Sequence, residues 1–199
     1  MTDLTPPEAA LEGLFWGLLL IASYSYFIYP LCLLFFRAVV ARPYTPVECL
    51  NAWPSVSLII AAHNEEKQIT EKLDNALALD YPHERLEIIV VSDGSSDQTD
   101  DIVAAYADRG VKLLCTGGWL GKERAQLQAI EAAGGDILVF SDAGTQIAAD
   151  ALRRIAAYFE DPDIAAVSSE DRFLSSDGDV AGEGLYVKYE MGLRRLESE

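Results

Sequence analysis

Short apolar runs alternate with segments of helical periodicity along most of the chain. The runs are continuously apolar, which is typical of strands that are buried on both faces of a sheet. We expect strands at 55–62, 86–93, 111–116, 136–142 and 164–171. The segments with apolar residues at helical spacing lie at 65–79, 97–108, 122–133 and 150–159. This alternation predicts an α/β fold, with a mostly parallel sheet that carries helices on both faces.

A longer apolar segment precedes this pattern. Residues 13–36 contain no charged side chain, and about 20 apolar residues suffice to span a bilayer core. A cleaved signal peptide would begin with basic residues, whereas Asp3, Glu8 and Glu12 precede this segment. A retained transmembrane helix is therefore favoured over a signal peptide or a buried soluble helix, and Pro30 predicts a kink in it.

The residues that flank the apolar segment predict its orientation. Arg37 and Arg42 follow the segment, and only acidic charges precede it. The positive-inside rule then predicts a single-pass protein of the inner membrane, with its N-terminus outside and its globular domain in the cytoplasm. We divide the chain into a tail, a transmembrane helix, a linker, a globular domain and an amphipathic C-terminal helix, at 1–12, 13–36, 37–54, 55–173 and 174–199.

The composition excludes one class of partner. The formal net charge is −17, and this acidity argues against a nucleic-acid-binding protein, which needs clustered Lys and Arg. A nucleotide is still compatible with the charge, because one metal ion and a few basic groups can hold a diphosphate. The cysteines Cys32, Cys49 and Cys115 lack the spacing of a zinc site, so we interpret them as reduced and structural.

Polar residues follow four of the predicted strands. In a parallel α/β sheet, ligands bind at the carboxyl ends of the strands, so these residues are expected to meet at one edge. The groups concerned are His63-Asn64-Glu65-Glu66, Asp93-Gly94-Ser95-Ser96-Asp97, Gly117-Gly118-Trp119-Leu120-Gly121-Lys122 and Asp142-Ala143-Gly144-Thr145. The first turn contains no Gly-x-Gly-x-x-Gly pattern and no P-loop is present, which argues against a dinucleotide oxidoreductase.

Each of these residues also has a simpler structural interpretation. Asp93 can accept hydrogen bonds from a nucleoside, whereas Ser96 and Asp97 are typical helix caps. Asn64 and Glu65 taken alone also suit a helix start.

The second pair of loops allows two interpretations in the same way. Lys122 lies at a helix N-terminus, where it could reach a diphosphate or simply be solvated. Asp142 ends a strand and can bind a divalent ion through oxygen. His63 is a further candidate for the wall of a base pocket.

Taken in this order, the loops resemble those of family-2 glycosyltransferases of the GT-A (Rossmann-like) fold, in their membrane-attached bacterial branch. The similar stretches cover about residues 55–173, which is the N-terminal half of that family's domain. They read SVSLIIAAHNEEKQI, LDYPHERLEIIVVSDGSSDQT, GKERAQLQAIEAAGGDILVFSDAGT and IAAVSSEDRF.

The resemblance implies roles for five residues. Glu65 and Asp93, with Asn64 beside them, would hold the nucleoside of a UDP- or GDP-linked sugar. Lys122 would lie near the diphosphate, and Asp142 would face the ribose and a Mg²⁺ or Mn²⁺ ion. The implied function is transfer of a sugar to an acceptor at the cytoplasmic face of the membrane, as in polysaccharide biosynthesis.

Two departures from the family pattern leave alternatives open. Gly144 replaces the second oxygen-bearing residue of the D-x-D-like motif, which weakens the expected metal site. The general base is expected beyond Glu199, since Asp171 and Glu190 do not lie in the family's motif. The chain could therefore need a missing domain or second subunit, or it could be an inactive nucleotide-sugar-binding or scaffold subunit or a gene fragment.

Overall fold

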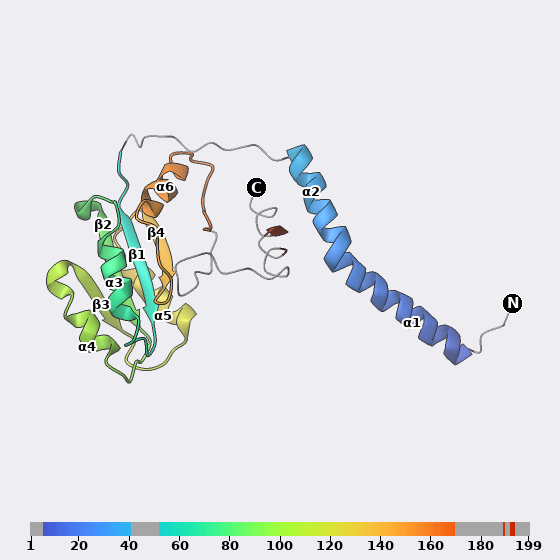
Figure 1. The fold of residues 1–199 in the computed structure, drawn as a ribbon, viewed down its shortest axis with the longest axis horizontal. Helices are drawn as coiled ribbons and strands as arrows, with labels where there is room; N and C mark the ends of the chain where they lie inside the picture. Colours follow the sequence, from blue (N-terminus) through green and yellow to red (C-terminus); the bar gives the residue numbers. More distant parts are fainter. Residues whose placement is uncertain (1–5, 41–51, 170–188, 190–191, 194–199) are drawn as a thin grey trace, which may run out of the picture. The chain divides into compact units, whose positions relative to one another are not determined.

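The computed structural model describes residues 6–40, 52–169, 189 and 192–193. Two compact units contain these residues (Figure 1). One unit holds the N-terminal helix together with residues from 168 onward, and the other spans Pro46–Val167. The predicted C-terminal helix at 174–199 lies almost entirely outside the described residues, as does the predicted domain boundary at 173.

The N-terminal unit contains a long helical segment. Helix α1 (Pro6–Ser23) and helix α2 (Tyr29–Val40) are joined by one π-helical turn at Tyr24–Ile28. Within it, Ala9–Phe36 is long and apolar enough to cross a membrane, by length and composition. The predicted span at 13–36 falls inside this stretch.

The π-helical turn lies next to the proline that the sequence analysis singled out. Pro30 has no amide hydrogen and cannot bond to the carbonyl of Tyr26 one turn earlier. Tyr29 donates its N–H to the carbonyl of Tyr24, in the wider π pattern. The carbonyl of Tyr26 instead accepts a hydrogen bond from the hydroxyl of Tyr189, at 3.0 Å. Proline therefore interrupts the α-helical hydrogen bonds without ending the helix.

The second unit is built on a parallel sheet, as predicted. Its strands are β1 (Val56–Ala62), β2 (Leu86–Ser92), β3 (Val111–Cys115) and β4 (Ile137–Asp142). They lie in the order β3-β2-β1-β4, and every pairing is parallel. Strand β1 is central: Leu58, Ile59 and Ile60 are fully buried, as continuous apolar strands require.

Helices cover both faces of this sheet. They are α3 (Ile69–Leu77), α4 (Thr99–Ala104), α5 (Lys122–Ala132) and α6 (Ala151–Tyr158). The larger core cluster joins one face of β1 and β2 to α3, α4 and α6, and the smaller cluster joins the opposite face to α5. Successive residues of β1 divide between the two clusters, because side chains alternate along a strand. Figure 1 shows this layered arrangement of the second unit.

The connections explain the strand order. The chain passes from β1 through α3 to β2 and through α4 to β3, with both helices on one face. It then crosses the opposite face as α5 and returns to pair β4 with the free side of β1. Since parallel crossovers are right-handed, a reversal of direction requires the helix to change face. The sheet therefore has a topological switch point between β1 and β4.

The fifth predicted strand, at 164–171, is not formed in its described part. Residues 164–169 have no regular secondary structure, and residues 170–171 lie outside the described residues. Ile164 and Val167 are only half-buried, and the residues between them are exposed. An apolar run becomes a strand only where a neighbouring strand pairs with it, and these residues pair with no described strand.

A partly buried hydrogen-bond network fixes the turn between α5 and β4. Gly134 donates its N–H to the carboxylate of Glu87, and Gly135 donates to the hydroxyl of Ser57. Burial of the carboxylate raises the pKa of Glu87, but hydrogen bonds from Gly134, Lys112 and Ser57 outweigh that effect and hold the pKa below its usual value. The turn is thus anchored to both central strands.

Gly135→Ala should destabilise the fold, whereas Gly134→Ala should not. A Cβ at Gly135 would lie 2.5 Å from the backbone nitrogen of Ser57, and a Cβ at Gly134 would meet no atom within 4 Å. Overpacking of this kind costs about 1–3 kcal/mol. Urea unfolding of the full chain in detergent measures both variants, and equal stability of the two would contradict the close packing.

Candidate functional site

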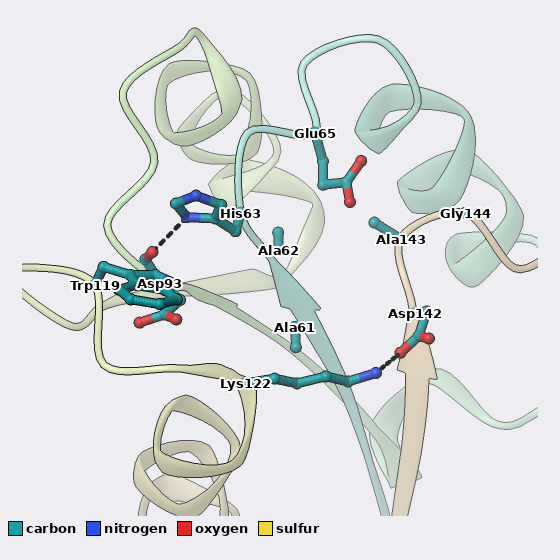
Figure 2. A pocket seen from close by; sticks show the side chains of 10 residues that line it. All are labelled: Ala61, Ala62, His63, Glu65, Asp93, Trp119, Lys122, Asp142, Ala143 and Gly144. Atoms are coloured by element: carbon teal, nitrogen blue, oxygen red, sulfur yellow. Dashed lines mark hydrogen bonds and ion pairs between the residues drawn. The ribbon is translucent and has the colours of Figure 1, made fainter.

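A pocket opens where the strand ends meet. Its volume is about 250 Å³. The residues that line it end β1 and β4, follow β1, β2 and β4, or lie in the loop before α5 and at its first residue. They are Ala61, Ala62, His63, Glu65, Asp93, Trp119, Lys122, Asp142, Ala143 and Gly144 (Figure 2). The pocket therefore lies at the carboxyl edge of the sheet and at its switch point, where α/β proteins bind ligands.

The loop after β1 is tied to the turn after β2. Asn64 has a positive φ of 56°, a conformation that Asn tolerates better than most residues. Its side-chain oxygen accepts a hydrogen bond from the N–H of Ser96 at 2.8 Å, and its own N–H donates to Ser95 at 3.1 Å. His63 donates from Nδ1 to the carbonyl of Asp93 at 2.6 Å. Asn64 thus holds the two turns together and is not one of the lining residues.

Glu65 presents its side chain to the pocket while its backbone is anchored. Its N–H donates to the hydroxyl of the buried Thr99 at 2.8 Å. Its carboxylate accepts a hydrogen bond from the amide of Gln68, and Figure 2 shows it directed toward Ala143. The later loop residue Gly144 lies beside the same amide, since a Cβ there would lie 3.2 Å from Gln68 Oε1.

Asp93 connects the turn after β2 to the glycine-rich loop before α5. The residue is 4% exposed, and its two carboxylate oxygens accept the N–H groups of Leu120 at 2.7 Å and Gly121 at 2.8 Å. Gly94, at φ 66°, lies against the same loop, because a Cβ would meet the nitrogen of Trp119 at 2.6 Å. Asp93 therefore fixes the backbone that carries both Trp119 and Lys122.

Lys122 and Asp142 form an ion pair across the pocket. Their N–O distance is 2.6 Å, and their side chains are 57% and 59% exposed. Figure 2 shows the Lys122 side chain reaching across β1 to Asp142. An ion pair this exposed contributes little to stability. Both charges are consequently available to an anionic ligand and a cation.

Asp142 can serve as the protein ligand of a divalent ion. No group of three or more His, Cys, Asp or Glu side chains arranged for a metal occurs in the described part of the chain. Mg²⁺, however, is often bound by one or two carboxylates together with substrate phosphates and water. Asp142 with the oxygens of a diphosphate fits that pattern, and Gly144 adds no side-chain oxygen to it.

The structure brings together four of the five residues that the resemblance singled out. Glu65, Asp93, Lys122 and Asp142 line one pocket, with His63 among them. Their ligand roles stay predictions.

Two further residues were given no role in the sequence analysis. Trp119 is 76% exposed on the anchored loop and lines the pocket; an aromatic residue in a glycine-rich loop after a strand was the available signal. Lys72 is fully buried beneath the loop after β4. Its signal was a lysine at helical spacing from the apolar residues Ile69 and Ala76.

Comparison with known proteins agrees with this fold. The family described as "Glycosyl transferase family 2" matches residues 57–196. A probable glycosyltransferase of Bacillus subtilis, YdaM, is 39% identical over 101 residues, which cover 48% of this chain and 24% of the relative. A beta-monoglucosyldiacylglycerol synthase of Trichormus variabilis is 34% identical over 137 residues, or 65% of this chain and 29% of the relative. The matched stretch is thus under a third of each relative's length.

A solved structure extends the likeness to three dimensions. The mannosyltransferase PcManGT from Pyrobaculum calidifontis, in complex with GDP-Man and Mn²⁺, superposes with a TM-score of 0.67 and 30% sequence identity. The likeness covers 77% of this chain and 46% of the mannosyltransferase. Sequence and fold therefore agree, and the chain belongs to glycosyl transferase family 2.

Proposed function

We propose that this chain binds a nucleotide-sugar donor in the pocket, for transfer of the sugar to an acceptor at the cytoplasmic face of a membrane. The observation that carries the proposal is the meeting of Glu65, Asp93, Lys122 and Asp142 at one sheet edge. Membership of the family and the likeness to a mannosyltransferase solved with GDP-Man and Mn²⁺ support it. The donor is accordingly a UDP- or GDP-linked sugar.

The two sides of the pocket suit the two ends of such a donor. His63, Asp93 and Trp119 lie together on one side, where an exposed indole ring offers a stacking surface for a base. Lys122 and Asp142 lie on the other, where an ammonium group at a helix N-terminus can hold diphosphate oxygens. The donor would therefore lie across the end of β1.

Donor binding would separate the Lys122–Asp142 pair. The ammonium group of Lys122 is released to the diphosphate, and the carboxylate of Asp142 is released to the cation. A divalent ion, when bound there, neutralises charge on the leaving diphosphate. The chain's own contribution is to orient the diphosphate from a loop that Asp93 keeps fixed.

The membrane location rests on the N-terminal segment. The stretch Ala9–Phe36 is long and apolar enough to span a bilayer, and its exposed side chains include Leu18, Ile21 and Phe27. With Arg37 and Arg42 after it, the globular domain is placed in the cytoplasm by the positive-inside rule. A membrane-associated acceptor follows from this placement.

Gly144 favours a second candidate, a subunit that binds the donor without transferring the sugar. It supplies no side-chain oxygen to the loop that holds Asp142. Release of the free nucleotide from the donor under turnover conditions separates the two candidates. Binding without release would identify a binding or scaffold subunit.

Donor binding should depend on a divalent ion and on Asp142. Calorimetric titration of UDP-glucose and of GDP-mannose into the full chain in detergent should show binding with Mn²⁺. The affinity should fall by about tenfold or more when EDTA removes the ion, or in Asp142→Ala, because a cation offsets the diphosphate charge. Asp101→Ala, an exposed carboxylate on α4, is the control. A folded chain that binds neither sugar nucleotide would contradict the proposal.

Trp119→Ala should weaken nucleotide binding, and Trp119→Phe should largely preserve it. Loss of base stacking costs about 1–3 kcal/mol, which corresponds to roughly tenfold in the Kd of UDP or GDP. Leu127→Ala removes another exposed apolar side chain, from α5, and should leave the Kd unchanged. Equal Kd values for Trp119→Ala and the unaltered chain would exclude a stacking role.

Asp93→Asn should loosen the glycine-rich loop even without a ligand. An amide offers one accepting oxygen, so the N–H groups of Leu120 and Gly121 can no longer both be satisfied. Hydrogen bonds to a charged acceptor contribute about 1.5–3 kcal/mol, so hydrogen exchange of these two amides should accelerate by about tenfold. Asp101→Asn is the matched control, and unchanged exchange in Asp93→Asn would refute the anchoring role.

A further inference from the structure

Lys72 is a buried lysine that neither the pocket lining nor the ion pairs explain. It lies in α3 between Ile69, Leu73 and Ala76, which all pack in the larger core, and it is 1% exposed. Lysine is almost never fully buried unless its charge has a partner. The groups around the ammonium group must therefore explain its burial.

The partners of Lys72 lie on both sides of the pocket's acidic residue. Its Nζ donates to the hydroxyl of Ser141 at 2.6 Å and to the carbonyl of Thr145 at 2.5 Å. The three residues between these partners, Asp142, Ala143 and Gly144, all line the pocket. One buried ammonium group thus joins the end of β4 to the far side of the loop that follows it.

The next turn of α3 holds the rest of the same loop. Asn75 donates from its amide to the carbonyl of Ile147 and accepts the N–H of Ile147, both at 2.9 Å. Lys72 and Asn75 are three residues apart, so they project from the same face of the helix. The loop after β4 is therefore held at two places by α3, and Lys72 is the attachment next to Asp142.

Burial of the charge opposes stability. Desolvation lowers the pKa of Lys72 to about 8, and the negative charge of Asp142 acts in the opposite direction. An apolar side chain of similar length would avoid this desolvation, since replacing buried charges by apolar groups is often neutral or stabilising. Core packing alone consequently does not account for a lysine here, whereas a charge directed at the Asp142 loop does.

We propose that Lys72 is a positioning residue of the donor site, whose ammonium group fixes Asp142 and the backbone of Ala143 and Gly144 for the metal-bound diphosphate. The proposal rests on the proposed function and adds a residue outside the pocket lining. Gly144 makes this support important: only Asp142 carries side-chain oxygens in the Asp142-Ala143-Gly144 segment, so a metal site there depends on the exact placement of Asp142. Buried groups that orient a metal ligand in this way typically affect metal affinity by about 10–100-fold.

Lys72→Met tests the proposal, because methionine keeps the apolar stem and removes the ammonium group. The full chain in detergent is titrated with UDP and with GDP in the presence of Mn²⁺, well below the midpoint of thermal unfolding, which is measured separately. We expect the Kd of the metal–nucleotide pair to rise by about tenfold or more. Hydrogen exchange of the Ala143, Gly144 and Thr145 amides should accelerate in the same variant. Lys67→Met, an exposed lysine just before α3, is the matched control and should change neither readout.

Ser141→Ala provides a second variant that keeps the charge and removes one partner. It should weaken metal–nucleotide binding in the same direction but less, and it decides the matter if Lys72→Met does not fold. Unchanged Kd and unchanged exchange in a folded Lys72→Met or Ser141→Ala would overturn the positioning role, even if the unfolding midpoint fell. Failure of the unaltered chain to bind either nucleotide would contradict the proposed function itself, and with it this role.

Discussion

The pairing of β1 on both sides is the constraint on which the rest of this structure depends. Its residues Leu58, Ile59 and Ile60 are fully buried, so every backbone group of the strand must find a partner in β2 or β4. Parallel pairing to both neighbours brings three strand ends to one edge, and the change of crossover face opens a space between them. The pocket thus results from the pairing of β1 with both neighbours and from the change of crossover face.

Two lysines lie around Asp142 although the chain as a whole is strongly acidic. The chain carries a formal charge of −17, yet Lys122 pairs with Asp142 from the solvent side and Lys72 lies beneath its loop. Coulomb interactions strengthen as water is excluded. The buried ammonium group of Lys72 therefore attracts the carboxylate of Asp142 more strongly than an exposed lysine at the same distance would. Asp142 thus has one exposed lysine, Lys122, and one buried lysine, Lys72, near it. This arrangement suits the proposed site, in which Lys122 leaves Asp142 for a diphosphate and a metal ion takes its place.

Rigidity in this site comes from side chains that bond to loop backbone. Asp93 accepts two N–H groups of the glycine-rich loop, and Asn64 accepts the N–H of Ser96. Gly94 allows the same loop to approach closely, since a Cβ there would clash with Trp119. Each turn is therefore held by hydrogen bonds to another turn. These bonds keep the functional side chains in place although the turns have no regular secondary structure.

The sequence by itself determined the order of strands and helices and the residues that follow each strand, because apolar periodicity and strand-end polarity are local properties. Only the tertiary structure decided which apolar runs pair: residues 164–169 form no strand, since a strand requires a neighbour. It likewise decided that Asn64 bonds to the turn after β2, that Trp119 lines the pocket, and that Lys72 bonds to the loop after β4. The bond from Lys72 to Ser141 joins residues 69 positions apart, and such a contact exists only once the sheet has brought α3 and β4 together.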